Sequence, residues 1–235
     1  MIAYARNGHS DKFGIPRQSR EESPIVTRIV FEPEYRVREA LRGIEGFSHL
    51  WLIWGFSKVE SQELRAKSQD WSPTVRPPRL GGNKRVGVFA TRSPFRPNPI
   101  GLSSVKLLSV QYSTVSHQME LLVSGADLLD GTPIYDIKPY LSFSDSHPEA
   151  INGFAEETKE YRLTVDWHKL KPLTLPADYH LNDPLVNELE YILSQDPRPA
   201  YQDDPEREYK MDYAGYTVTF TVEKNTIFVQ KIEKK

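Results

Sequence analysis

Residues 71–102 read WSPTVRPPRLGGNKRVGVFATRSPFRPNPIGL, and no other stretch of the chain has this composition. Between Asp70 and Glu120 there are seven lysine and arginine residues and no acidic residue, although the whole chain has a formal net charge of −2. Six prolines in the window restrict φ and bias the residues before them towards extended conformations. Because a guanidinium group matches the geometry of carboxylate and phosphate, this window predicts an anion-binding surface. The alternative is a solvated basic loop.

The composition indicates an ordinary globular protein, since 38% of the 235 residues are hydrophobic and 26% are charged. The absence of cysteine excludes disulfides, thiolate metal sites and a cysteine nucleophile. The six histidines show no paired spacing, so we expect no metal site. No apolar run approaches the roughly 18 residues of a membrane span, and the N-terminus has no apolar signal core. These features predict a cytoplasmic protein.

Short β-branched and aromatic segments in and around this window predict strands. These segments are residues 25–31, 47–56, 85–92, 101–112 and 117–124. The aromatic segment 47–56 is expected to be buried on both faces. A short helix should begin at Pro33 and end near Gly43, and residues 127–140 should form a loop. Many short strands at close intervals favour a β-barrel or a sandwich over βαβ repeats.

The chain becomes polar after residue 140, and we place a domain boundary there that gives domains 1–145 and 146–235. In the second domain, residues 183–195 predict an amphipathic helix with Pro184 in its first turn. Strict alternation at residues 216–222, a turn at Lys224 and Asn225 and a returning segment at 226–232 predict a terminal β-hairpin. The chain as a whole is therefore expected to be mainly β with some α (α+β).

Familiar signatures of nucleotide-binding and hydrolase sites are missing from the sequence. It contains no Walker A motif and no G-x-G-x-x-G motif between a strand and a helix, so the common nucleotide folds are not indicated. Ser103 and Ser104 lack the G-x-S-x-G context of a nucleophile elbow, which argues against a serine hydrolase.

Several loop side chains nevertheless have the chemistry of a ligand site. Arg17, Arg92 and Arg96 could each bind a carboxylate or phosphate through two hydrogen bonds. Asp127 or Asp130 could accept hydrogen bonds from the hydroxyls of a ribose.

Apolar side chains next to these polar groups could flank an adenine ring; they are Leu102, Leu128 and Leu129. An arginine for a carboxylate, an aspartate for a ribose and an apolar slot for a purine together fit S-adenosylmethionine. The alternative is that Asp130 and Gly131 only form a turn.

The most distinctive motifs follow one another in a fixed order. They are FGIPRQ (13–18), VREALRGIEGFSHLW (37–51), PTVRPPRLGGNKRVGVFATRSPFRPNPIGLS (73–103), DLLDGTPIYDIKPY (127–140) and DPRPAY (196–201). With these motifs the sequence resembles the TrmO-type tRNA methyltransferases (the TsaA or YaeB-like family) over most of its length. The resemblance implies that domain 1–145 is a small β-barrel rather than a Rossmann fold. It also implies a C-terminal α+β domain that contributes to tRNA binding, and a homodimer.

The resemblance further implies the reaction and its ligands. The enzyme would use S-adenosylmethionine to methylate N6 of N6-threonylcarbamoyladenosine next to the tRNA anticodon. The residues that match the family's cofactor contacts are Pro16, Arg17, Gln18, Ser57, Lys58, Arg92, Leu102, Leu128, Leu129, Asp130 and Gly131.

Methyl transfer from a sulfonium depends mainly on alignment of donor and acceptor, so a base has only to remove one proton from N6. The candidate bases are Asp136, Asp196 and Tyr201. The expected contacts to tRNA phosphates, which position the substrate without reading its sequence, are Arg76, Arg79, Arg96 and Arg198. Unstacked anticodon bases could stack on Tyr135, Tyr140 and Tyr201.

Two other classes of function remain open at this point. One is a non-catalytic RNA-binding module, in which the basic window binds phosphates and the aspartates form turns. The other is an S-adenosylmethionine-dependent methyltransferase with a different small acceptor.

Overall fold

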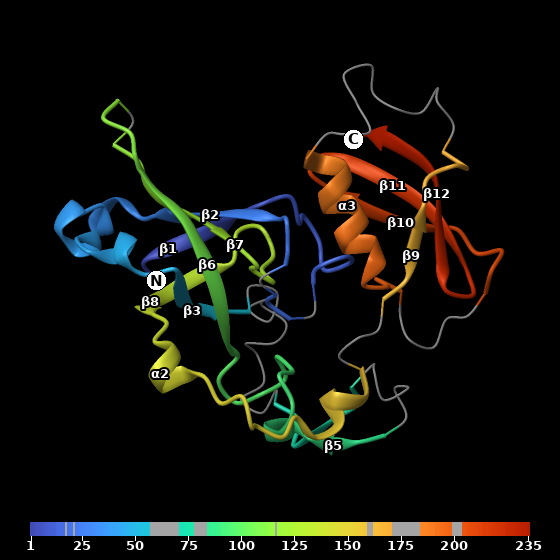
Figure 1. Ribbon diagram of the computed structural model, residues 1–235, viewed down its shortest axis with the longest axis horizontal. Helices are drawn as coiled ribbons and strands as arrows, with labels where there is room; N and C mark the ends of the chain where they lie inside the picture. Colours follow the sequence, from blue (N-terminus) through green and yellow to red (C-terminus); the bar gives the residue numbers. More distant parts are fainter. Residues whose placement is uncertain are drawn as a thin grey trace.

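The computed structural model describes residues 1–16, 18–20, 22–56, 71–77, 84–115, 117–158, 162–170, 184–198 and 204–235. Six antiparallel strands form a closed barrel in the order β1-β2-β7-β6-β3-β8 (Figure 1). Their bounds are β1 Ala3–Arg6, β2 Val26–Phe31, β3 His49–Gly55, β6 Ile100–Tyr112, β7 Met119–Ser124 and β8 Pro133–Pro139. Closure pairs each of these strands on both sides, which removes exposed sheet edges. The barrel expected from the sequence is confirmed.

Alternating side chains fill the barrel interior, as the period of two along a strand requires. In β3, Leu50, Leu52 and Trp54 are buried, whereas Trp51 and Ile53 are only half-buried. The prediction that segment 47–56 is buried on both faces is therefore wrong. One face of β3 packs into the barrel core, and the other face remains accessible from outside.

Between β2 and β3 the chain forms three 3-10 turns instead of the predicted helix. They are η1 Pro33–Tyr35, η2 Arg38–Leu41 and η3 Ile44–Gly46. Gly43 adopts a φ of 88°, a left-handed conformation that interrupts the run, and none of the turns contains a buried residue. The partly apolar face of this segment is too short to support an α-helix against the barrel.

The cation-rich window folds back on itself beside the barrel. β4 (Thr74–Val75) pairs with β5 (Val86–Gly87), and η5 (Val88–Ala90) follows directly. The predicted strand at 85–92 is therefore wrong after Gly87. The backbone N–H and the hydroxyl of Thr91 both donate to the carbonyl of Val88, which turns the chain away from an extended path.

The predicted loop at 127–140 is a strand in its second half. β8 closes the barrel between β1 and β3, with Pro133 and Pro139 at its two ends. A proline has no N–H to give to a ladder, so it is tolerated at the end of a strand but not in its middle. The prolines that suggested a stiff loop instead mark where pairing begins and ends.

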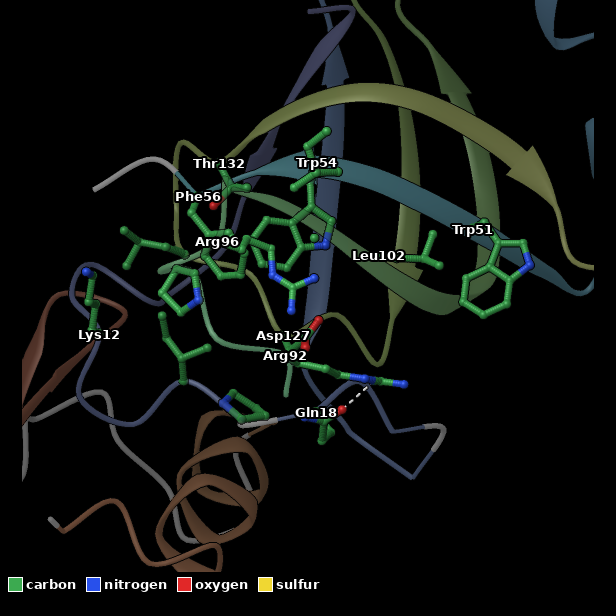
Figure 2. A pocket seen from close by; sticks show the side chains of 16 residues that line it. Lys12, Gln18, Trp51, Trp54, Phe56, Arg92, Arg96, Leu102, Asp127 and Thr132 are labelled. Carbon is green, nitrogen blue, oxygen red and sulfur yellow. Dashed lines mark hydrogen bonds between the residues drawn. The ribbon is translucent and has the colours of Figure 1, made fainter. Parts of the chain in front are cut away.

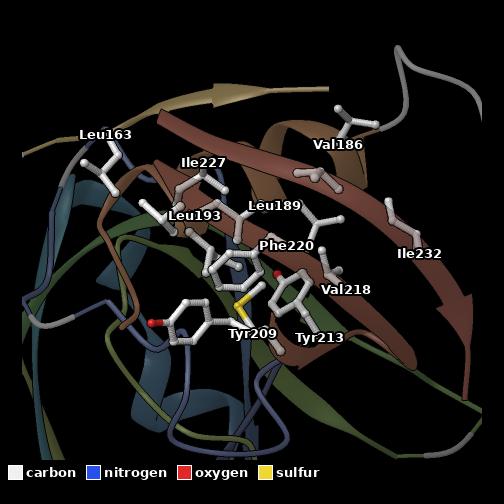
Figure 3. Packing of buried hydrophobic residues seen from close by; sticks show 14 of the residues in the cluster. Leu163, Val186, Leu189, Leu193, Tyr209, Tyr213, Val218, Phe220, Ile227 and Ile232 are labelled. Atoms are coloured by element: carbon white, nitrogen blue, oxygen red, sulfur yellow. The ribbon is translucent and has the colours of Figure 1, made fainter. Parts of the chain in front are cut away.

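The C-terminal part forms a four-stranded sheet in the order β10-β11-β12-β9, with helix α3 packed on one face (Figure 3). The bounds are β9 Thr164–Asp166, α3 Pro184–Ser194, β10 Tyr209–Tyr213, β11 Tyr216–Glu223 and β12 Thr226–Lys234. The helix and the hairpin confirm the predictions, whereas β10 was not predicted. Val186, Leu189, Ile192 and Leu193 bury the apolar stripe of α3 against the sheet. Two further short helices are α2 (Ser142–Asp145) and η6 (Gly153–Thr158).

The loop between β1 and β2 ties the barrel to the C-terminal sheet. The N–H of Ala214 donates to the carbonyl of Gly8 at 2.9 Å, and the rings of His9 and Tyr213 meet edge to face at 5.0 Å. Burial lowers the pKa of His9 to about 4, so its ring is neutral at physiological pH. Ile25 also belongs to the hydrophobic cluster of the C-terminal sheet. Among the described residues, no helix is long and apolar enough to span a membrane.

Candidate functional site

A cavity of about 630 Å³ opens where the end of β3, the start of β6 and three loops meet (Figure 2). Its volume lies within the range typical of small-molecule sites. Aromatic and aliphatic side chains form most of the wall. The polar and charged lining residues are Lys12, Gln18, Arg92, Arg96, Asp127 and Thr132.

A chain of hydrogen bonds ends at a carboxyl group in the cavity wall. Trp54 Nε1 donates to Ser103 Oγ at 2.9 Å, and Ser103 Oγ donates to Asp127 Oδ1 at 2.5 Å. Burial raises the pKa of Asp127, although the Ser103 hydrogen bond and the positive charge of Arg92 act in the opposite direction. Of the two aspartates considered for the ribose, Asp127 is the one that lines the cavity.

Gly101 allows the Trp54 indole to lie close against β6. A Cβ atom at residue 101 would lie 2.2 Å from the indole ring, closer than any real contact. The cross-strand pair of Trp54 and Gly101 therefore defines the depth of the cavity at this point.

Arg92 extends over the cavity from the loop that follows η5. Its Nη1 donates to Gln18 Oε1 at 2.5 Å, so the cation-rich window and the β1–β2 loop meet at the cavity edge. A guanidinium group has five N–H donors, and this hydrogen bond uses one of them. Pro16 and Leu102 also line the cavity, as does Leu129. Five residues expected to bind the cofactor are thus brought together here.

Arg96 has a different environment from the one expected for a phosphate contact. Its guanidinium donates to the carbonyls of Ser93 at 2.9 Å, Thr91 at 2.5 Å and Val88 at 3.3 Å. These hydrogen bonds hold the loop that carries Arg92. Arg96 also lines the cavity, and its guanidinium stabilises its own loop.

The loop before β8 buries Leu128 and presents Leu129, the next residue, to the cavity. Leu128 is fully buried in the barrel core, and its carbonyl accepts a hydrogen bond from Asn7 at 2.9 Å. Asp130 accepts hydrogen bonds from the Asn7 N–H at 3.1 Å and from Arg6 at 3.4 Å. Gly131 has a φ of 77°, so it forms the turn that the sequence suggested as the alternative. These contacts fix the loop that carries Asp127 and Leu129.

Strand register brings three residues onto the outer face of the barrel beside the cavity. Ile53 of β3 pairs with Leu102 of β6 on one side and with Asp136 of β8 on the other. Trp51 lies two residues before Ile53 on the same face and lines the cavity. Asp136 forms an ion pair with Lys138 at 2.8 Å, and this hydrogen bond is the main reason why the pKa of Asp136 is lowered.

The C-terminal candidates lie in a closed environment. Arg198 is only 7% exposed, and its guanidinium binds both carboxylate oxygens of Asp196, at 2.8 and 3.0 Å. The charges of this pair are directed towards each other. Arg76 of the basic window, by contrast, is exposed. The predicted site residues that lie outside the described residues are Arg17, Ser57, Lys58, Arg79 and Tyr201.

Several cavity residues were not predicted from the sequence, namely Lys12, Trp51, Trp54, Phe56 and Thr132. Trp51 and Trp54 lie on β3 and Phe56 follows it directly, just before Ser57 and Lys58 of the expected cofactor contacts. This position in the sequence was the signal that could have identified the three aromatic residues. Within the described residues, no group of three or more histidine, aspartate or glutamate side chains could hold a metal ion.

Comparisons with known proteins give a consistent picture along the whole chain. Residues 4–146 match the family model of the tRNA-methyltransferase O N-terminal domain, and residues 160–235 match that of the TrmO C-terminal domain. A tRNA (adenine(37)-N6)-methyltransferase of Eikenella corrodens is 44% identical over 79% of this chain and 97% of its own length. A relative from Pseudomonas aeruginosa, 39% identical over 88% of this chain and 85% of its own, is described as an S-adenosylmethionine-dependent methyltransferase.

A solved structure is similar over the full chain. The crystal structure of TrmO from Pseudomonas aeruginosa superimposes with a TM-score of 0.75 at 31% sequence identity. The match covers 100% of this chain and 95% of that one, so the barrel and the C-terminal sheet are both shared.

Proposed function

The chain belongs to the tRNA-methyltransferase O family, and on this premise we propose that it methylates N6 of an adenine in tRNA with S-adenosylmethionine as the methyl donor. The observation that carries the proposal is the cavity at the end of the barrel. It combines an extended apolar wall with one half-buried carboxyl group, Asp127, and an exposed guanidinium, Arg92. These are the groups that an amphipathic, zwitterionic ligand requires.

The lining residues fit S-adenosylmethionine group by group. Arg92, oriented by Gln18, suits the carboxylate of the methionine part. Asp127 suits the ribose hydroxyls, since its position is fixed by Ser103. Leu102 and Leu129 provide an apolar surface for the adenine.

The remaining predicted contacts complete this proposed cofactor site. Pro16 lines the cavity directly. Leu128, Asp130 and Gly131 shape the loop that presents Asp127 and Leu129. Contacts to the cofactor are also proposed for Arg17, Ser57 and Lys58, which lie outside the described part of the chain.

S-adenosylmethionine would supply an electrophilic methyl group, and the protein's task is to align the acceptor with it and to exclude water. The N6–H proton of the acceptor has to leave as the new bond forms. We propose Asp136 as the group that accepts this proton, because its strand register places it on the same outer face as Trp51 and Leu102. Its lowered pKa keeps Asp136 ionised at neutral pH, which a proton acceptor requires.

We assign the C-terminal candidates a supporting role. Buried Arg198 and half-buried Asp196 neutralise each other, so they suit a rigid segment that presents Tyr201 better than direct chemistry. Contacts to tRNA phosphates are proposed for Arg76 and, beyond the described residues, for Arg79.

The proposed acceptor is N6-threonylcarbamoyladenosine, and the proposed assembly is a homodimer. A threonylcarbamoyl group carries a carboxylate, and the basic window that borders the cavity is rich in cations. An N6 atom attached to a carbamoyl group also loses its proton more readily than the amino group of plain adenosine. Size-exclusion chromatography with light scattering tests the homodimer.

Two measurements test the proposed function. Calorimetry with S-adenosylmethionine should show binding at one site per chain. Mass spectrometry of nucleosides should show a mass gain of one methyl group on the threonylcarbamoyladenosine of tRNA after incubation with enzyme and cofactor. Binding of tRNA without any cofactor binding would support a plain RNA-binding module and contradict the proposal. Cofactor binding with methylation only of plain adenosine or of another small acceptor would contradict the proposed substrate.

A further inference from the structure

The cavity has a second aromatic region that the cofactor contacts do not use. Figure 2 shows Trp51 beyond Leu102, on the far side from the group formed by Trp54, Phe56 and Thr132. Trp51 is half-buried, and its indole lines the cavity from the outer face of β3. A methyltransferase needs a place for its acceptor directly beside the methyl donor.

The Trp51 indole is held in one orientation by hydrogen bonding and packing. Its Nε1 donates to Asp145 Oδ2 at 2.7 Å, and the Leu141 N–H donates to the same oxygen at 3.0 Å. The ring of Tyr140 packs against the indole with centroids 5.5 Å apart and planes at 52°. These contacts fix an aromatic ring that would otherwise turn about its side-chain bonds, so a ligand that stacks on it does not have to order it first.

We propose that Trp51 is a stacking subsite for the acceptor base of tRNA and that Asp145 is the positioning residue that holds its indole. This inference rests on the proposed function. Unstacked bases of single-stranded RNA are commonly recognised by stacking on aromatic side chains. An indole has the largest π face among the side chains, and its one polar atom is already satisfied by Asp145.

Two purines could stack on this ring: the adenine of the cofactor and the adenine of the RNA. The geometry favours the RNA base. The groups suited to the cofactor's polar parts, Arg92 and Asp127, lie with Gln18 on the other side of Leu102. Asp136, the proposed proton acceptor, shares the outer face with Trp51. A base stacked on Trp51 would therefore lie beside the cofactor contacts, on the face of the barrel that also carries the proposed proton acceptor.

The first test replaces the ring. The probe is an anticodon stem–loop RNA that carries threonylcarbamoyladenosine, with initial rates measured at saturating S-adenosylmethionine. Trp51→Ala is expected to raise KM for this RNA by roughly 5- to 150-fold, the effect of losing one base–aromatic stack, while cofactor affinity by calorimetry stays unchanged. Trp51→Phe should restore part of the loss. The matched control is Tyr35→Ala, which removes an exposed aromatic ring on η1, outside the cavity lining, and should leave KM unchanged.

The second test separates positioning from simple structural support. Asp145→Ala should raise KM for the RNA in the wild-type background, because the indole is no longer held. In a Trp51→Phe background the same change should have no further effect, because phenylalanine has no N–H for Asp145. Asp145→Asn keeps an acceptor oxygen and should rescue KM in the wild-type background. Equal effects in both backgrounds would show that Asp145 only supports α2 and would overturn the positioning role.

The outcomes distinguish this inference from the proposed function. If folded Trp51→Ala keeps the wild-type KM, or if it loses cofactor affinity instead, the acceptor subsite is overturned while methyl transfer by the wild type still supports the function. If the wild-type protein transfers no methyl group to the RNA, the proposed function fails first. Unchanged RNA binding with a changed oligomeric state in Trp51→Ala would mean that a second copy of the chain covers this face, which also overturns the subsite.

Discussion

The barrel and the C-terminal sheet each bury a complete hydrophobic core, but they place their charged groups in opposite ways. At the cavity of the barrel, Asp127 is half-buried and bound by Ser103, while Arg92 stays exposed. In the C-terminal part, Arg198 is buried and Asp196 is half-buried, and they bind each other through two hydrogen bonds. An open arrangement of charges can receive a ligand, whereas a closed pair holds a segment in place. From this comparison we expect the chemistry to take place on the barrel and the C-terminal sheet to have a structural role.

The largest expected effect is a loss of stability when a core side chain of the C-terminal part is truncated. Leu189 is fully buried between α3 and the sheet, so Leu189→Ala should destabilise the protein by about 2–5 kcal/mol. The folded fraction should still bind S-adenosylmethionine with wild-type affinity, because the cavity belongs to the barrel. Thermal unfolding and calorimetry below the transition measure the two quantities. Glu190→Ala on the exposed side of α3 is the control. A loss of cofactor affinity in folded Leu189→Ala would contradict the division of roles.

The next largest expected effect is a loss of cofactor affinity when the exposed guanidinium of Arg92 is replaced. Arg92→Lys keeps the charge but loses the planar fork, so cofactor affinity should fall roughly 10- to 150-fold, as for a lost hydrogen bond to a charged group. Stability should change little, since the Arg92 side chain is exposed. Arg85→Lys in the same window, where the arginine binds Thr74, should leave the affinity unchanged. Calorimetric titration of both variants decides whether Arg92 belongs to the pocket.

The sequence predicted those elements in which one physical pattern dominates. Helix α3 and the β11–β12 hairpin follow directly from apolar periodicities, and β6 from its β-branched residues. β8 was missed because its terminal prolines resemble loop punctuation, and only the pairing with β1 and β3 shows that they lie at strand ends. Tertiary pairing decided this segment, and no local pattern contains that information.

The sequence indicated several of the residues that line the cavity, but it did not indicate what each side chain does there. Pro16, Gln18 and Arg92 lie together in the cavity, as the motifs indicated. Arg96 looked equivalent to Arg92 in sequence, but its guanidinium satisfies three carbonyls of its own loop. Which arginine faces a ligand and which holds the loop depends on where the backbone carbonyls point. Trp51 was missed as a site residue because its strand was expected to be buried on both faces.

A smaller effect is expected from the exposed cation of the basic window. Arg76→Ala should leave cofactor affinity unchanged and weaken tRNA binding. The slope of log affinity against log salt should fall by roughly 0.7 if one single-strand phosphate contact is lost. Lys210→Ala, an exposed cation on the C-terminal sheet, is the control and should keep the wild-type slope. Titrations at several salt concentrations measure this slope, and a wild-type slope for Arg76→Ala would remove it from the tRNA-binding surface.

The smallest effect concerns the ion pair on the outer face of the barrel. The hydrogen bond from Lys138 is the main cause of the lowered pKa of Asp136, so Lys138→Met should raise that pKa. If Asp136 accepts the proton, activity is lost as the pH falls through its pKa. The acid limb of the kcat profile should therefore move to higher pH in Lys138→Met. The pair also contributes a little stability at neutral pH, which is lost as the pH falls through the folded-state pKa of Asp136.

Two controls sharpen this last expectation. Lys231→Met removes the partner of Glu233 on the C-terminal sheet, an exposed ion pair of similar geometry, and should leave the acid limb in place. Asp136→Asn should lower kcat without changing cofactor affinity. An acid limb that stays fixed in Lys138→Met would show that a group other than Asp136 titrates in the reaction. Since the barrel, not the C-terminal sheet, is expected to respond, the pair of lysine variants compares the two regions within a single type of measurement.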